Sequence, residues 1–321
     1  MSVLSYSSAK VPFFQKLPEL TAFFRMRMQS LLHPHELAAL FSDLDEYNAL
    51  LQQYAQNSVE KAKIFEIGYG ARPNRLLALI SLGVDAYGVD LDVPILQGRP
   101  REFLAIYQTN GVERLLKSIV RFPLLDLVER YYLDRELQTY GKKLKVITDR
   151  FLVQDATSLE LRDESLDLIF SEDVFEHIPI HSLERLIPKM AKWLKPSGLA
   201  LIRPNIFTGI SGGHLAEWFS HTVKDQSRPR KSEPWEHLRK KRYRANTYLN
   251  QVSRAGYRSL FGASFQILEE QVKAPNLGKE FFSSAVQADL QEYREEELFS
   301  NQVLFVLRPK KTPTRLVAEA R

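Results

Sequence analysis

Residues 63–74 of the chain read KIFEIGYGARPN, and this run decides how the rest of the sequence is interpreted. The pattern predicts a short buried strand, a turn that contains Gly68 and Gly70, and the start of a helix. A second predicted strand covers residues 85–89 and ends on Asp90, twenty residues after Gly70. A strand, a glycine turn, a helix and a second strand with an acidic end form the first half of a nucleotide-binding unit.

The α/β pattern continues along the chain with interruptions. Further strands are predicted over residues 151–155, 166–170, 199–203, 265–268 and 302–307. Helical spacing of apolar residues covers residues 1–60 and then residues 93–143, where no strand is predicted. We therefore expect a Rossmann-like α/β fold, with a mostly parallel seven-stranded sheet flanked by helices, an N-terminal helical cap and a helical insertion. The insertion follows the second strand and is expected at the carboxyl edge of the sheet, as a lid or as packing.

One further helix is predicted between the strands at residues 166–170 and 199–203. Pro188 lies inside its apolar pattern and is expected to kink or split it. The helix is expected to stop at residues 195–198, which read KPSG and place a cation and then a glycine at its end.

The composition excludes several classes of protein. Of the 321 residues, 44% are hydrophobic and 26% are charged, as in ordinary globular proteins. The chain contains no cysteine, which excludes disulfides, thiolate catalysis and zinc–cysteine sites. No apolar run approaches the roughly 18 to 20 residues that span a bilayer, and no export signal is recognised, so we expect a cytoplasmic protein.

The net charge of +5 is concentrated in one segment. Residues 224–244 contain nine basic and three acidic residues, so the rest of the chain is close to neutral. This segment belongs to a long polar loop, residues 206–245, that follows the predicted strand at 199–203. A local basic patch fits an anionic substrate or partner, and it fits a solvated loop equally well. A polar tail is expected over residues 310–321.

The glycine turn separates two classes of nucleotide site. A dinucleotide site has a third glycine where this chain has Pro73. The sequence EIGYG at residues 66–70 instead resembles the E-x-G-x-G motif of class I S-adenosylmethionine-dependent methyltransferases. The resemblance continues in order through Asp90, Asp155-Ala156, the stretches 167–171 and 174–178, and the LKPSG turn at 194–198. It implies a methyltransferase domain over residues 61–309 with an antiparallel last strand.

The resemblance also implies S-adenosylmethionine as the cofactor. Glycine lets a ligand approach the main chain, and Asp90 is placed to accept hydrogen bonds from the ribose. Arg72 is interpreted either as a partner of the cofactor carboxylate or as a surface arginine. The expected cofactor-binding residues are Glu66, Gly68, Tyr69, Gly70, Arg72, Asp90, Leu91, Asp155, Ala156, Ser171 and Glu172.

Two histidines are candidate catalytic residues, because transfer to a hydroxyl is helped by a general base. His177 follows the predicted strand at 166–170, and His214 follows the one at 199–203. The reference pKa of an imidazole, about 6.5, suits proton abstraction. The alternatives are a packing role for His177, an exposed loop position for His214, and catalysis by positioning alone. No metal site is expected, although four neighbouring side chains could share a cation: Glu172, Asp173, Glu176 and His177.

The expected function is methylation of a hydroxyl on a small molecule or on a sugar or glycan. The loop after residues 166–170 lacks the N-P-P-Y sequence of amino-directed nucleic-acid methyltransferases, so a nucleic-acid acceptor is not expected. An anionic acceptor and contact of the basic loop with anionic lipid stay open, as do the oligomeric state and the methylated atom. The rival hypotheses are an NAD(P)-dependent oxidoreductase, which Pro73 disfavours, and a non-catalytic scaffold protein that binds the cofactor.

Overall fold

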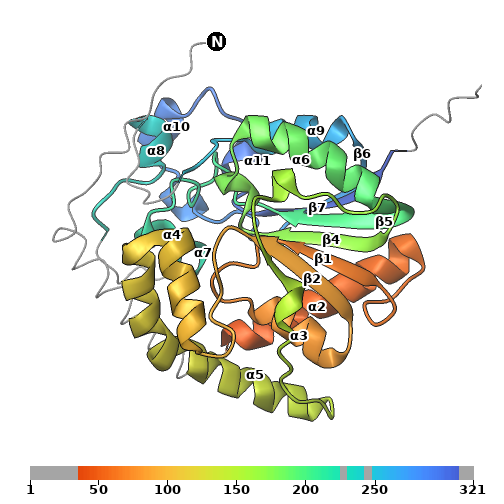
Figure 1. The fold of residues 1–321 in the computed structure, drawn as a ribbon. Helices are drawn as coiled ribbons and strands as arrows, with labels where there is room; N and C mark the ends of the chain where they lie inside the picture. The colour runs from red at the N-terminus through yellow and green to blue at the C-terminus, as the bar shows by residue number, and fades with distance from the viewer. Residues whose placement is uncertain (1–34, 225–229, 242–247, 311–321) are drawn as a thin grey trace, which may run out of the picture.

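The computed structural model describes residues 35–224, 230–241 and 248–310, and its centre is one seven-stranded sheet (Figure 1). The strand order is β3-β2-β1-β4-β5-β7-β6. Neighbours from β3 to β5 pair in parallel, whereas β7 is antiparallel to both β5 and β6. The strands are β1 Lys63–Ile67, β2 Asp85–Asp90, β3 Phe151–Val153, β4 Leu166–Glu172, β5 Leu194–Arg203, β6 Phe265–Val272 and β7 Val303–Pro309. The predicted fold class, including the antiparallel last strand, is confirmed.

Helices cover both faces of the sheet. One face packs against α2 and α3 together with the side chains of α5, and the other face packs against α6 and α9 (Figure 1). The longer helices are α2 His35–Leu50, α3 Asn74–Leu82, α4 Pro100–Arg121, α5 Leu127–Thr139, α6 Ile180–Trp193 and α9 Arg254–Gly262. The shorter ones are α7 Ser220–Val223, α8 Glu236–Arg239, α10 Ser284–Asp289 and α11 Glu295–Leu298. Single helical turns are Leu51–Ala55, Phe122–Asp126, Thr148–Arg150, Ala156–Ser158, Phe175–His177, Ala216–Trp218 and Lys279–Phe281.

The strands read as apolar runs because they are buried on both faces, as parallel strands are. In β4, for example, Leu168, Ile169 and Phe170 are all fully buried, with alternate side chains entering the two opposite core clusters. Because β1 to β5 run parallel, their carboxyl ends meet at one edge of the sheet, and the loops after them lie together there.

Two local predictions near β5 are wrong. α6 runs without a break through Pro188 to Trp193, because one face of the helix is buried on the sheet and outweighs one lost backbone hydrogen bond. The chain is then extended at once, and Leu194 already pairs with Leu166 of β4. The expected turn at residues 195–198 thus lies within β5, where it forms an irregularity in strand register between the pairs Leu166–Leu194 and Leu168–Leu199.

A third, smaller core lies under the loop that follows β5. Trp235 is fully buried there, and its indole Nε1 donates a hydrogen bond to the carbonyl of Thr208 at 3.2 Å. Phe282 and Phe299 pack against its ring at centroid distances of 5.7 and 6.1 Å. Trp235 belongs to this core, although it lies in the basic segment of the sequence.

Parts of the expected organisation lie outside the described residues. These parts are residues 1–34 of the cap, 225–229 and 242–247 of the basic loop, and 311–321 of the tail. The proposed domain bounds, 1–60 and 61–309, therefore stay predictions. Across the described ranges, no helix has both the length and the apolar character needed to cross a bilayer.

Candidate functional site

The glycine turn begins where β1 ends and sits at the carboxyl edge of the sheet. Gly68 has φ +82° and Gly70 has φ +66°, backbone conformations that L side chains rarely adopt. A Cβ on Gly68 would lie 2.3 Å from a methyl carbon of Val174, so this glycine permits contact between the turn and the loop after β4. A Cβ on Gly70 would meet no atom within 4 Å, so the turn is open at that position. The turn therefore offers bare main chain to a ligand.

Asp90 ties the end of β2 to this turn. Its Oδ2 accepts a hydrogen bond from the amide of Gly70 at 2.7 Å, and its Oδ1 accepts one from the amide of Asp92 at 2.7 Å. Burial raises the pKa of the carboxyl from its usual value, while the amide of Gly70, the charge of Arg114 and the amide of Leu91 favour the ionised form. A carboxylate has about four acceptor positions, so both oxygens keep capacity for a ribose hydroxyl. The residue fits the role expected of it.

Three other expected cofactor residues make contacts within the protein. The Tyr69 hydroxyl donates to the carbonyl of Leu152 at 2.8 Å, and the side chain is buried. Ser171 Oγ donates to the carbonyl of Ile67 at 2.7 Å, which joins β4 to the end of β1. Asp155 Oδ1 accepts from the amide of Thr157 at 2.8 Å and caps the short turn that begins at Ala156.

The helical insertion contacts the far side of the glycine turn. Arg72 is half-buried and ion-paired with Glu129, and its two expected roles stay predictions. Asn74 Nδ2 donates to the other oxygen of Glu129 at 2.8 Å. Asn110 Nδ2 donates to the carbonyl of Leu91, whose side chain is 64% exposed. The insertion is therefore fastened to the same loops that bear the expected cofactor residues.

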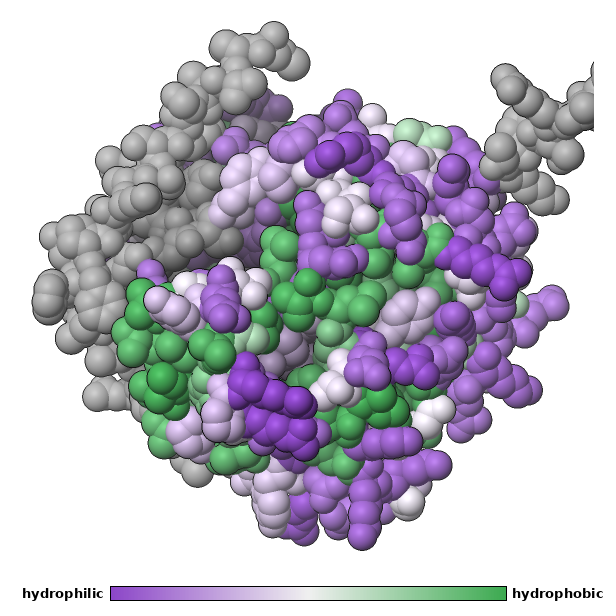
Figure 2. Space-filling model, viewed as in Figure 1, coloured by the Kyte–Doolittle hydropathy of each residue, from purple (hydrophilic) through white to green (hydrophobic). Residues whose placement is uncertain are grey.

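The outer surface of α4 is apolar. Figure 2 shows hydrophobic residues gathered over α4 and around a hollow near the middle of the same face. The exposed large hydrophobic residues on α4 are Leu104, Tyr107, Val112, Leu116, Ile119 and Val120.

A buried network of charges lies under the expected cofactor site, on the side of α2. Glu172 contacts the hydroxyl of Tyr47 and the guanidinium of Arg203, and Arg75 NH1 lies 3.7 Å from Glu66 Oε1. Asp43 of α2 accepts hydrogen bonds from Arg75 and Arg203, the closest pairs at 2.9 Å. Sequence reasoning missed Asp43, Tyr47, Arg75 and Arg203, because no local motif marks them.

The network holds three carboxyls against two guanidinium groups, so one carboxyl has no matching cation. Burial raises the pKa of Glu66 to about 7. The charge of Arg75 opposes this shift, and the charges of Glu172 and Asp90 add to it. Burial likewise raises the pKa of Glu172 to about 7. The carboxyls of Glu66 and Glu172 therefore take part in fastening α2 to the strand ends, a role that their position in the motif does not reveal.

The Glu66→Gln variant is expected to change how stability depends on pH. A folded-state pKa near 7, above the usual 4.5, means that the folded protein holds this proton more tightly. The stabilisation is complete below pH 4.5 and is lost as pH rises through 7. From about pH 5 to 8, wild type should lose on the order of 2–3 kcal/mol relative to Glu66→Gln. Urea unfolding across this range measures the difference.

Exposed Glu60 offers a matched control, since Glu60→Gln should follow the wild-type curve. If the free energy of unfolding changes with pH in the same way for wild type and Glu66→Gln, then Glu66 has the same pKa in the folded and unfolded chain.

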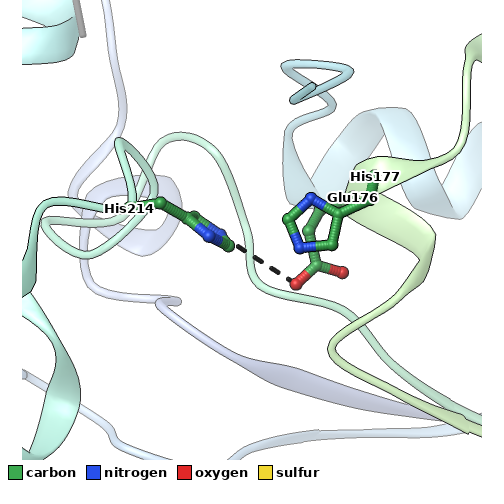
Figure 3. Close-up of side chains that lie close together, drawn as sticks. All are labelled: Glu176, His177 and His214. Carbon is green, nitrogen blue, oxygen red and sulfur yellow. Dashed lines mark ion pairs between the residues drawn. The ribbon is translucent and has the colours of Figure 1, made fainter. Parts of the chain in front are cut away.

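The two candidate catalytic histidines do come together, and Glu176 lies with them (Figure 3). His177 ends the helical turn after β4, and His214 lies in the loop after β5 with φ +53°. Their ring centroids are 5.0 Å apart, and His214 Nε2 lies 4.0 Å from Glu176 Oε1. The loop after β4, which bears Glu176 and His177, touches Gly68 through Val174.

Polar residues from other segments hold the group of three in place. Asn205 Nδ2 donates to Glu176 Oε1 at 2.9 Å, and Asn250 Nδ2 donates to the carbonyl of Phe175 at 2.7 Å. His177 Nδ1 lies 2.9 Å from the carbonyl oxygen of Tyr248. The loops after β4 and β5 and the segment before α9 therefore build one site.

The electrostatics of this group follow from burial. Burial lowers the pKa of His214 to about 4, and the neighbouring His177 and His237 lower it further. The imidazole of His214 is therefore neutral at physiological pH. Burial raises the pKa of Glu176 to about 8, and the charge of Asp173 adds to this shift. The group therefore presents neutral nitrogen atoms beside a buried carboxyl.

Comparison with known proteins places this architecture in a class. Residues 125–202 match the family model of a methyltransferase domain. Over 155 residues the chain is 32% identical to phosphoethanolamine N-methyltransferase 1 of Triticum aestivum, a match that covers 43% of this chain and 30% of that protein. The chain thus spans less than a third of the length of this curated relative.

Solved structures with a similar fold come from several organisms. The PH0226 protein of Pyrococcus horikoshii OT3 superposes with a TM-score of 0.41 and 16% identity, over 84% of this chain and 90% of that chain. An S-adenosylmethionine-dependent methyltransferase of Methanosarcina mazei superposes with a TM-score of 0.42 and 16% identity, over 81% of this chain and 96% of that chain.

Residues 125–202 thus match a methyltransferase domain, and the strand order and the ordered motifs are similar to those of class I S-adenosylmethionine-dependent methyltransferases. S-adenosylmethionine is therefore the cofactor expected for this site, in preference to a dinucleotide.

Proposed function

We propose that the protein transfers the methyl group of S-adenosylmethionine to a hydroxyl oxygen of a small molecule or glycan. The observation that carries the proposal is the group of Glu176, His177 and His214, two of which lie on the loop that touches the glycine turn through Val174. Gly68, Gly70 and Asp90 are proposed to hold the cofactor. The acceptor is proposed to lie between that turn and the two histidines.

The chemistry requires a nucleophilic oxygen at the moment of transfer. A hydroxyl is a weak nucleophile until its proton is removed or its pKa is lowered. Burial lowers the pKa of His214, so its imidazole is neutral at physiological pH and carries a lone pair for the acceptor proton, although it is a weaker base than an exposed imidazole. His177 stands beside it and completes the polar wall of the proposed acceptor site.

A second candidate acceptor is a phosphate-bearing amine. The curated relative from Triticum aestivum is named for N-methylation of phosphoethanolamine. The basic segment offers this phosphate little support, because two of its cations are already paired within the protein. Arg239 is paired with Asp289 at 2.6 Å and with Glu233 at 2.9 Å. Lys240 is also paired with Glu233, at 2.7 Å. We therefore place the hydroxyl acceptor first.

The test is to incubate the protein with labelled S-adenosylmethionine and fractionated small-molecule and glycan extracts, with phosphoethanolamine as a separate arm. Label on an oxygen of the product supports the proposal, and label only on the amine favours the second candidate. With the acceptor in hand, His214→Gln is expected to lower kcat by about 10²- to 10⁴-fold. Cofactor affinity, measured by calorimetry, should stay unchanged.

His181→Gln is the control, because His181 is exposed on α6 and outside the group of three. An undiminished kcat for His214→Gln would remove His214 from the catalytic machinery.

A further inference from the structure

The group of Glu176, His177 and His214 has the composition of a metal site. One ligand atom from each residue lies within 4.8 Å of the others. Figure 3 shows the three side chains turned toward one another from two separate loops. Two imidazole nitrogens and a carboxylate oxygen form a donor set that binds borderline divalent ions such as zinc, manganese, iron, cobalt or nickel.

A second observation concerns the buried oxygen of Glu176. The residue is only 4% exposed, and its Oε2 accepts no hydrogen bond from the residues that the structure describes. Its Oε1 accepts one from Asn205. A buried carboxylate oxygen without a donor is costly, by about 1–3 kcal/mol or more for a charged group. A bound cation would satisfy this oxygen.

His177 is also presented as a ligand. His177 Nδ1 faces the carbonyl of Tyr248 at 2.9 Å, so the hydrogen of the neutral ring belongs on Nδ1 and the lone pair on Nε2. A ring that donates its other N–H to a backbone carbonyl is the usual arrangement of a metal-binding histidine.

We propose that Glu176, His177 and His214 bind one divalent transition-metal ion beside the glycine turn. This replaces the expectation from sequence that the chain has no metal site. The short sequence EH at residues 176–177 gives two ligands, and the third comes from the loop after the next strand. Only the parallel order of β4 and β5 brings these loops together.

The role of the ion rests on the proposed function, although its binding does not. The ion takes the acceptor hydroxyl oxygen as a further ligand and lowers its pKa, and the proton passes to water. The oxygen then forms a bond to the methyl carbon, while the carbon–sulfur bond breaks and its electron pair stays on sulfur. The two histidines thus act on the acceptor through the ion.

The test uses the full chain, freed of metal by a chelator and titrated with manganese, cobalt, zinc and magnesium ions. One equivalent of cobalt should bind and give visible absorption typical of nitrogen and oxygen ligands, and magnesium should bind more weakly. Glu176→Gln and His214→Gln should each weaken binding by about 10- to 100-fold or more, and His181→Gln should not. Zinc should raise the Tm of wild type and leave that of His214→Gln unchanged.

Cofactor binding, measured separately by calorimetry, keeps the two proposals apart. Failure to bind S-adenosylmethionine would overturn the proposed function and leave the metal titration valid. Absence of metal binding to wild type, or equal binding by wild type and both ligand variants, would overturn the metal site. Undiminished transfer by the metal-free protein would overturn the role of the ion and return the histidines to direct proton abstraction.

Discussion

Replacement of Asp90 with alanine is expected to weaken binding of S-adenosylmethionine by about 10- to 100-fold. Hydrogen bonds to a charged group contribute roughly 1.5–3 kcal/mol, and each 1.4 kcal/mol is about a factor of ten in affinity. The variant loses both the proposed ribose contacts and the hydrogen bond that holds the amide of Gly70 at 2.7 Å. Calorimetric titration with the cofactor measures the change.

The matched control lies at the other end of the same strand. Asp85 begins β2 at the opposite edge of the sheet, where it is exposed and paired with Arg150. Asp85→Ala should leave cofactor affinity unchanged. Equal affinities for wild type and Asp90→Ala would show that the ribose is held elsewhere, and the proposed cofactor site would have to be redrawn.

Gly70→Ala is expected to separate stability from cofactor binding. The variant must adopt φ +66°, which costs an alanine about 1–2 kcal/mol, and this lowers the free energy of unfolding by a similar amount. Its methyl group meets no protein atom within 4 Å and enters the open side of the turn. If the cofactor lies there, its affinity should fall by roughly tenfold or more, an effect of about 1.4 kcal/mol.

Gly83→Ala isolates the backbone term. Gly83 follows α3 with φ +95°, and a Cβ there also meets nothing within 4 Å, but the position lies at the far end of the helix from the turn. Gly83→Ala should therefore destabilise the fold by a similar amount, as urea unfolding can show, while cofactor affinity is preserved. If both variants bind the cofactor as wild type does, the cofactor does not approach Gly70.

The structure bears out sequence reasoning best where burial and local backbone geometry act on neighbouring residues. The buried strands β1 and β4 are visible as apolar runs, and the turn between β1 and α3 is visible because positive φ favours glycine. Near Pro188 the same reasoning was wrong, because packing of α6 on the sheet outweighs the local preference of proline to break a helix.

The sequence by itself determined the fold class and led to S-adenosylmethionine as the expected cofactor. Glu66, Gly68, Gly70 and Asp90 belong to one short unit, and their spacing carries the signal. It did not show that Glu66 belongs to a buried network with Arg75 and Asp43, since those partners come from other helices.

The tertiary structure alone decided what borders the glycine turn. His214 meets Glu176 and His177 because β5 lies beside β4 in parallel and their following loops share one edge. Arg72 meets Glu129 because the insertion packs against the turn. Such meetings depend on how distant segments pack, and packing energy is spread over many side chains, so no local spacing in the sequence records it.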